Sequence, residues 1–404
     1  MAYTFFILAG EASGDLHASK LMQAIRRVEP TVRFVGMGGK AMAAAGLDVA
    51  KNLDGMQVVG FWEVAKHYNF FVSVGDQLLD RLKQERPDAL ICIDYPGFNL
   101  RFAEKVKKLG IPVLYYIVPQ VWAWKPKRAK KMARIVDQAF CVFDFEPPFF
   151  EQYGLKTTFV GHPLVDHKYV VPPRLEFPSD RKTVALLPGS RSGEFNEHIR
   201  PLCEGFNLAA AKLQNLRGVL SLPKGITTGT TITADAQKFE LSYAPPKQLP
   251  ETRIAITGAG EPELRALAAV NETPVGHASL LPGAADFSVV KSGTSTLEAG
   301  LAGNPLCVLY RGSWASYAIA HQLVNIPVFS LVNIVLGRYA VPELLQEDVN
   351  PARIAAEIER GLTDEKYREQ QRAALAELPK KLGGPGASDR AACGIMDFIK
   401  GRRG

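Results

Sequence analysis

Short apolar runs alternate with segments of helical period along most of the chain. Residues 3–8 are mostly apolar and predict a strand. Residues 14–28 place apolar side chains every three to four positions, which predicts an amphipathic helix. A further helix is expected at 99–109, and further strands at 89–93, 113–118, 139–143 and 157–160. This alternation is typical of a parallel, doubly wound α/β sheet.

The pattern is interrupted at residues 163–181, where four prolines lie among polar residues and indicate a linker. It then resumes, with helices expected at 194–213 and 294–302 and strands at 183–187, 287–290 and 305–309. Residues 224–252 are rich in threonine and proline and show no clear period, so loop or irregular β structure is expected there.

We therefore expect two doubly wound, Rossmann-like α/β lobes that face a central cleft. The first lobe covers residues 1–170 and the second covers residues 171–350. Residues 351–404 form C-terminal helices, for which a return to the first lobe stays open.

The composition excludes several classes of protein. With 47% apolar and 22% charged residues among 404, the chain is not largely disordered. The 48 basic and 41 acidic residues leave a net charge of +7, so we expect no nucleic-acid partner unless these charges form a concentrated patch.

No apolar stretch reaches the roughly 18–20 residues of a membrane span, and the first residues lack the features of a secretory signal. The five cysteines are scattered without a CxxC pair, which fits a reducing cytoplasm better than a disulfide framework. The histidines show no metal-ligand spacing, so no metal site is predicted.

Candidate chemistry lies after the strands, because open α/β sheets bind ligands at the carboxyl ends of their strands. The loop after the first strand contains Glu11, Ser13, Gly14 and Asp15 and opens a helix. It suits an uncharged, hydroxyl-rich ligand, since its two carboxylates would repel a phosphate. The alternative is a plain turn capped by Ser13.

Asp94 follows the strand at 89–93, in a turn fixed by Pro96 and Gly97, with Asn99 as the expected N-cap of the next helix. A carboxylate at this edge of the sheet could act as a general base. The alternative is a turn aspartate that bonds its own backbone.

Two loops of the second lobe combine glycines and hydroxyls with a helix N-terminus. The first contains Gly189, Ser190 and Arg191, and the second contains Ser292, Gly293 and Thr294. Glu298, one turn into the second helix, could accept hydrogen bonds from a ribose diol. Either loop alone could be an ordinary turn, but the two together favour a nucleotide diphosphate.

Two segments of the first lobe place aromatic and basic side chains together. The aromatic residues are Phe61, Trp62, Phe70 and Phe71, and the basic residues are Lys127, Arg128, Lys130 and Lys131. Such a combination suits contact with an anionic membrane surface. The alternative is the edge of a packed core and a solvated helix.

Eight motifs occur in a characteristic order: GEASGD (10–15), RFVGMGG (33–39), IDYPGFN (93–99), VPQVWAW (118–124), FVGHPLVD (159–166), LLPGSR (186–191), SGTSTLEA (292–299) and LVNIVLGR…PELLQE (331–347). Together they closely resemble the lipid A disaccharide synthases, which are inverting glycosyltransferases of the two-lobed GT-B type. The resemblance is weakest over residues 205–276. An acidic residue frequent in this family is Gly97 here, and a frequent proline is Val332.

The resemblance implies transfer of 2,3-diacylglucosamine from UDP-2,3-diacylglucosamine to lipid X, which is 2,3-diacylglucosamine 1-phosphate. By this likeness Asp94 is the catalytic residue and Arg191 contacts the diphosphate. Ser292, Thr294 and Glu298 hold the nucleotide, and the GEASGD loop, together with Asn99, lies on the acceptor side. No metal or organic cofactor is implied.

The likeness also implies a cytoplasmic protein bound peripherally to the anionic inner face of the cytoplasmic membrane. The oligomeric state stays open, a homodimer included. The alternatives are another GT-B enzyme, such as a lipid-linked N-acetylglucosaminyltransferase or a UDP-sugar 2-epimerase, and a two-lobed ligand-binding protein without activity. The motifs IDYPGFN and VPQVWAW favour the disaccharide synthases.

Overall fold

The structure is a computed structural model of the chain, and its described residues form two units. These residues are 2–52, 68–124, 127–166, 181–189, 192–213, 216–222, 231–234, 237–243, 251–254, 264–268, 281–312 and 328–403. Unit 1 comprises Met1–Asp166 together with Leu382–Gly404, and unit 2 comprises His167–Lys381.

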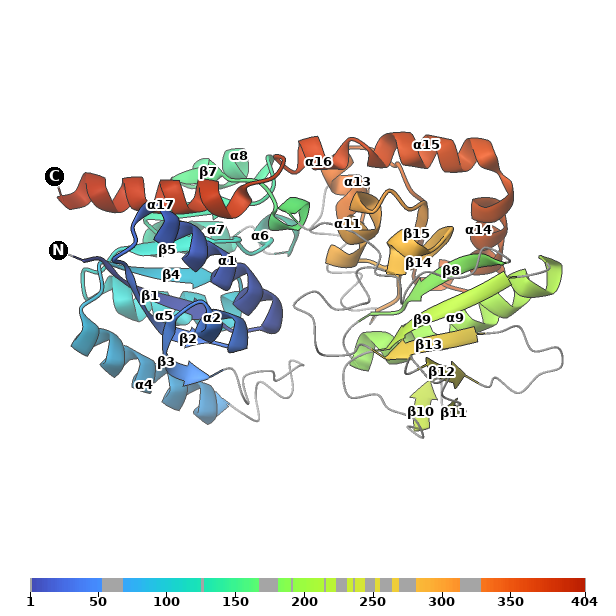
Figure 1. Ribbon diagram of the computed structural model, residues 1–404, viewed down its shortest axis with the longest axis horizontal. Helices are drawn as coiled ribbons and strands as arrows, with labels where there is room; N and C mark the ends of the chain where they lie inside the picture. The colour runs from blue at the N-terminus through green and yellow to red at the C-terminus, as the bar shows by residue number, and fades with distance from the viewer. Residues whose placement is uncertain are drawn as a thin grey trace. The chain divides into compact units, whose positions relative to one another are not determined.

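Unit 1 is built on a parallel sheet of seven strands in the order β3-β2-β1-β4-β5-β6-β7 (Figure 1). The strands are β1 (Thr4–Ala9), β2 (Arg33–Gly38), β3 (Leu47–Asn52), β4 (Ala89–Ile93), β5 (Val113–Tyr116), β6 (Gln138–Cys141) and β7 (Thr157–Phe159). Every residue of β4 and β5 is buried, as expected for strands covered by helices on both faces.

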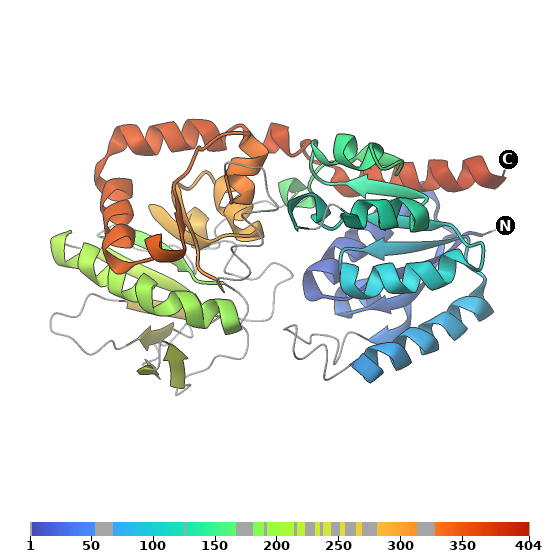
Figure 2. The same ribbon diagram turned by 180° about the vertical axis from the view of Figure 1, so that it is seen from behind.

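The helices of unit 1 are α1 (Ala12–Val28), α2 (Lys40–Ala44), α4 (Tyr68–Glu85), α5 (Pro96–Lys107), α6 (Val121–Trp124), α7 (Lys127–Ile135), α8 (Glu146–Glu151) and α17 (Ala387–Arg403). Helices α4, α5 and α7 pack on one face of the sheet (Figure 2), and α1 and α17 lie together on the other (Figure 1).

Helix α17 is held in unit 1 by packing and hydrogen bonds. It packs against α1, Arg390 Nε donates to the carbonyl of Val160 at 2.8 Å, and the Gly386 N–H donates to Asp166 Oδ1 at 2.6 Å. A Cβ placed on Gly394 would lie only 2.6 Å from the Phe140 ring. The close approach of α17 to β6 therefore requires glycine at this position.

Unit 2 is built on a mixed sheet of nine strands in the order β10-β11-β12-β13-β9-β8-β14-β15-β16. The strands are β8 (Lys182–Leu187), β9 (Leu216–Leu222), β10 (Thr231–Ala234), β11 (Gln237–Tyr243), β12 (Glu251–Ile254), β13 (Leu264–Ala268), β14 (Phe287–Lys291), β15 (Leu306–Tyr310) and β16 (Glu343–Leu345). In this order, the strands from β13 through β9, β8, β14 and β15 to β16 are parallel. Strands β10, β11 and β12 extend the sheet by antiparallel pairing.

The helices of unit 2 are α9 (Ser192–Lys212), α10 (Leu281–Ala284), α11 (Thr294–Leu301), α13 (Leu331–Leu336), α14 (Pro351–Thr363), α15 (Glu365–Leu375) and α16 (Leu378–Lys381). Helices α9 and α14 pack against each other, and both contribute to the core beneath β8 and β14. No described helix in either unit is long and apolar enough to cross a membrane.

Most predicted elements are confirmed within a few residues, but the predicted cap Asn99 is wrong, and so is Ser13 as the alternative cap of the first helix. Helix α1 starts at Ala12 with Glu11 as its N-cap, so Ser13 lies in the first turn and caps nothing. Helix α5 starts at Pro96 with Tyr95 as its N-cap, which places Asn99 inside the helix. Proline displaces the cap because its fixed φ suits the first helical position.

The segment 224–252, predicted as loop or irregular β structure, contains β10, β11 and the start of β12 among its described residues. In the predicted linker, residues 163–166 form a short 3₁₀ helix of unit 1, and residues 167–180 lie outside the described part.

Candidate active site

The carboxyl edge of the unit 1 sheet brings the loop after β1 and the turn after β4 together. Ala9 and Ile93 are paired at the ends of these neighbouring strands, so Gly10 and Asp94 follow side by side. A Cβ on Gly10 would lie 2.0 Å from the Tyr95 ring, so only glycine allows this contact. Burial, and to a smaller extent the charge of Glu11, raise the pKa of Tyr95.

The turn at Asp94 has an uncommon backbone conformation. Asp94 and Tyr95 have φ angles of +43° and +46°, a region that costs a non-glycine residue about 1–2 kcal/mol. Asn99 Nδ2 donates to the carbonyls of Ile93 at 3.1 Å and Asp94 at 2.8 Å, and Tyr115 Oη donates to the Asp94 carbonyl at 2.6 Å. Two fully buried side chains therefore hold the strained turn. Asn99 acts there as a turn anchor, and Tyr115 was missed by sequence reasoning.

The Asp15 carboxylate accepts hydrogen bonds from backbone N–H groups at the start of α2. Its Oδ1 accepts the N–H groups of Gly39 at 2.8 Å and Met42 at 3.0 Å, and its Oδ2 accepts that of Ala41 at 3.0 Å. These are the unpaired amides at the start of α2, so Asp15 holds α2 in place. Glu11 and Ser13 are exposed, and Gly14 is buried against Ala9.

The carboxyl edge of the unit 2 sheet brings the two glycine loops together, because β8 and β14 are neighbours. Gly189 and Gly293 have φ angles of +122° and +151°. Thr294 is exposed at the N-terminus of α11, and Thr296 closes the first turn by donating to the Gly293 carbonyl at 2.8 Å. Ser190 and Arg191 lie outside the described residues, so their predicted contact with a diphosphate has no geometry here.

Glu298 lies one turn into α11 and is partly buried. Burial raises the pKa of its carboxyl to about 7. Ser292, by contrast, is buried, and its N–H donates to the Leu309 carbonyl at 2.8 Å. The helix N-terminus and the carboxyl group of Glu298 thus offer hydrogen-bond donors and an acceptor on one short helix.

A network missed by sequence reasoning connects these loops. Lys291 Nζ lies 2.8 Å from Glu194 Oε1, at the start of α9. His198, one turn further on, donates from Nδ1 to the Glu194 carbonyl at 2.6 Å and accepts the Arg311 N–H on Nε2 at 2.9 Å. Burial lowers the pKa of His198 to about 4, so it is neutral at pH 7.

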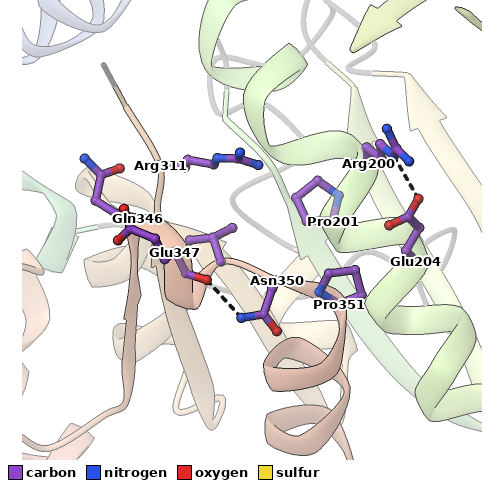
Figure 3. Close-up of a pocket in the computed structure, with 9 residues that line it drawn as sticks. Arg200, Pro201, Glu204, Arg311, Gln346, Glu347, Asn350 and Pro351 are labelled. Atoms are coloured by element: carbon purple, nitrogen blue, oxygen red, sulfur yellow. Dashed lines mark hydrogen bonds and ion pairs between the residues drawn. The ribbon is translucent and has the colours of Figure 1, made fainter. Parts of the chain in front are cut away.

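A cavity of about 340 Å³ opens beside the carboxyl edge of the unit 2 sheet (Figure 3). Arg200, Pro201 and Glu204 of α9 line one side, with Arg200 Nε 2.8 Å from Glu204 Oε1. Arg311 and Gln346 are among the lining residues that follow β15 and β16. None of the described residues predicted to bind the donor nucleotide lines this cavity.

The aromatic and basic segments of unit 1 are only partly described. Phe70 and Phe71, at the start of α4, are partly buried against the core. Helix α7 buries Ala129, Met132 and Ile135 and exposes Arg128, Lys130, Lys131 and Arg134, with Lys131 Nζ 2.7 Å from Glu104 Oε2. Phe61, Trp62 and the Lys127 side chain lie outside the described part.

Trp122, in the same stretch, faces inward. Its Nε1 donates to Glu146 Oε1 at 3.2 Å, and its ring meets Phe145 edge to face. Glu146 is fully buried, and this burial raises its pKa to about 8. Trp122 of the VPQVWAW motif therefore contributes to the packing of unit 1.

Comparison with known proteins identifies the family. A sequence profile described as lipid-A-disaccharide synthetase matches residues 5–275 and 276–393. The chain belongs to the lipid-A-disaccharide synthetase family. The two matched ranges together include all of residues 205–276, where the motifs resemble this family least.

Curated relatives agree with this family over almost the whole chain. A lipid-A-disaccharide synthase of Anaeromyxobacter dehalogenans strain 2CP-1 is 40% identical, and the match covers 98% of this chain and 97% of the relative. A lipid-A-disaccharide synthase of Syntrophus aciditrophicus is 38% identical with the same coverage.

Similar solved structures share the fold at low sequence identity. An S. aureus MnaA–UDP co-structure has a TM-score of 0.67 at 11% identity, covering 99% of this chain and 97% of that one. The glycotransferase of kitacinnamycin has a TM-score of 0.58 at 16% identity, covering 98% of each chain. These neighbours confirm the predicted fold of two Rossmann-like lobes of the GT-B type.

Family membership also decides between the classes of function that the sequence left open. Lipid-A-disaccharide synthetases are glycosyltransferases, so the chain is an enzyme and not an inactive ligand-binding protein. UDP-N-acetylglucosamine 2-epimerases share its fold, but only at 10–11% identity.

Proposed function

We propose that this glycosyltransferase moves 2,3-diacylglucosamine from UDP-2,3-diacylglucosamine to the 6-hydroxyl of lipid X. The products are the β-1,6-linked lipid A disaccharide 1-phosphate and UDP, with inversion at the transferred carbon. The strained turn at Asp94, beside the loop at Glu11, is the observation that carries the proposal. Backbone strain that buried side chains maintain is typical of functional sites.

In this reaction Asp94 acts on the acceptor. A sugar hydroxyl is a weak nucleophile, so a base must remove its proton as the new bond forms. The hydroxyl oxygen attacks C1 of the donor sugar, the bond from C1 to the diphosphate breaks, and the carboxylate of Asp94 takes the proton. Tyr115 and Asn99 support this role because they hold the backbone that carries the carboxylate.

The donor nucleotide is assigned to unit 2. The N-terminus of α11 and the loop Gly189–Arg191 would bind the diphosphate, since helix N-termini and arginine both suit phosphate oxygens. Glu298 would accept hydrogen bonds from the ribose hydroxyls. Groups that are already in place stabilise the negative charge that grows on departing UDP.

The acyl chains of both substrates place the reaction at a membrane surface. We assign the contact to the exposed face of α7 and to the aromatic residues Phe61, Trp62, Phe70 and Phe71. The contact would be peripheral, on the inner face of the cytoplasmic membrane, where anionic lipids attract basic side chains.

The deciding experiment incubates the pure protein with UDP-2,3-diacylglucosamine and lipid X and measures UDP and disaccharide. The unmodified protein should form both in equal amounts. Asp94→Asn keeps the size of the side chain but cannot take up the proton, so kcat should fall by about 10²-fold or more. Absence of disaccharide, or a near-normal kcat for Asp94→Asn, would refute the assignment.

A further inference from the structure

The ion pair between Lys291 and Glu194 lies between the two glycine loops of unit 2. Its side chains are 15% and 24% exposed. A Cβ on Gly189 would lie 3.0 Å from Glu194 Oε2, and a Cβ on Gly293 would lie 3.9 Å from Lys291 Nζ. The carboxylate is therefore beside the first loop and the ammonium is beside the second.

His198, which belongs to the network around this pair, is uncharged at pH 7. His198 is fully buried, and its two ring nitrogens are occupied by the Glu194 carbonyl and the Arg311 N–H. It keeps Glu194 in position as a neutral group. Lys291 supplies a positive charge directly beside the two glycine loops.

A structural role alone explains this lysine poorly. For an ion pair as buried as this one, the cost of removing both charges from water offsets much of their attraction, so the pair is weak evidence for a role in stability. An ammonium has three donors, and one of them is used by Glu194 Oε1. Lysine binds phosphate as a compact charge on a flexible stem, so its place beside Gly293 and the α11 N-terminus has a direct use in phosphate binding.

We propose that Lys291 binds the diphosphate of the donor and that Glu194 holds the Lys291 ammonium between the loops. This inference rests on the proposed function and adds a residue to its donor site. The ammonium keeps one N–H on Glu194 and donates the others to phosphate oxygens. It thereby neutralises part of the charge on bound and departing UDP.

The test compares binding of UDP and uridine to the full chain by calorimetry. Lys291→Met should weaken UDP binding about tenfold or more, the loss expected for a charged hydrogen-bonding partner, and should change uridine binding less than about twofold. Lys291→Arg should keep most of the UDP affinity. Lys182→Met is the matched control. Lys182 pairs with Asp286 at 3.1 Å, at the amino end of β8, so UDP binding should not change.

Glu194→Gln distinguishes phosphate binding by Lys291 from a purely structural role of the ion pair. It keeps an oxygen for Lys291 but removes the charge that holds the ammonium, so UDP affinity should fall by less than in Lys291→Met. Unchanged UDP affinity in Lys291→Met would overturn the inference, as would an equal loss in Glu194→Gln and Lys291→Met at unchanged melting temperature. If the unmodified protein bound no UDP, the donor site of the proposed function would fail together with the inference.

Discussion

Single residues decide the backbone conformation of the turn at Asp94, which we assign to the acceptor side. Asp94 and Tyr95 adopt a backbone that most side chains avoid, and Tyr115 and Asn99 maintain it by hydrogen bonds to carbonyl oxygens. The backbone that carries the Asp94 carboxylate is thus held by two buried side chains. Residues of this kind should affect kcat more than donor binding.

Tyr115→Phe tests this positioning role. The change removes one hydrogen bond to the Asp94 carbonyl, which is worth about 0.5–1.5 kcal/mol, so kcat should fall about threefold to tenfold with UDP affinity unchanged. The control is Tyr116→Phe, the neighbouring buried tyrosine, whose hydroxyl makes no hydrogen bond to this turn. Equal kcat values for the two variants would contradict the role of Tyr115.

The raised pKa of Glu298 predicts that the affinity for UDP depends on pH. Its pKa of about 7 leaves it partly protonated at neutral pH, and only the ionised form accepts hydrogen bonds from both ribose hydroxyls. UDP affinity should therefore rise about fivefold to tenfold between pH 6 and pH 8, as the carboxyl ionises. The UDP phosphate also ionises in this range, so the measurement is the difference between the unmodified protein and Glu298→Gln. Parallel pH curves would exclude this role.

At the scale of elements, buried parallel strands could be predicted from the sequence because both of their faces are apolar. β4 occupies the residues that the pattern predicts, and the rule that ligands bind at strand ends locates Asp94, Gly189 and Ser292. Helix starts were less certain, since Asn99 suits an N-cap but Pro96 begins α5.

Contacts between distant residues could not be predicted in this way. Lys291 and Glu194 are 97 positions apart and meet because β8 and β14 are neighbours in the sheet. The period of a strand does not specify its neighbours. Likewise, Tyr115 reaches the Asp94 carbonyl from the adjacent strand β5, and a buried aromatic residue in a strand usually indicates only packing.

Two glycines of α17 test how this helix packs. Gly394→Ala should destabilise unit 1 by about 1–3 kcal/mol, because the new methyl group would overlap the Phe140 ring. Gly401 has no atom within 4 Å of its Cβ position, so Gly401→Ala should leave stability unchanged or raise it by up to about 1 kcal/mol. Thermal unfolding of both variants measures the difference, and equal melting temperatures would contradict the packing.

At the scale of the whole molecule, we expect surface charge to determine the proposed membrane contact. The net charge of +7 is modest, but α7 exposes Arg128, Lys130 and Arg134 within a few residues of one another. Each such cation near an anionic bilayer is worth about 1 kcal/mol and is screened by salt.

Vesicle sedimentation tests this surface. The protein should bind anionic vesicles at low salt and be released at high salt, and changing Arg128, Lys130 and Arg134 to Gln should weaken binding at least tenfold, or about 1.4 kcal/mol. The control changes Arg360, Lys366 and Arg372 of unit 2 to Gln and removes the same charge. Equal binding by the two triple variants would show that total charge determines membrane contact, and not the position of the basic residues on α7.

The return of α17 to unit 1 has a consequence for synthesis on the ribosome. Strands β1–β7 emerge first, but the helix that covers Phe140 and packs against α1 emerges only after all of unit 2. Unit 2 is continuous in the chain and can complete its sheet earlier. Until α17 has been synthesised, unit 1 therefore lacks the buried side chains of Ala391, Ile395 and Ile399 and presents an apolar face that a nascent-chain chaperone would recognise.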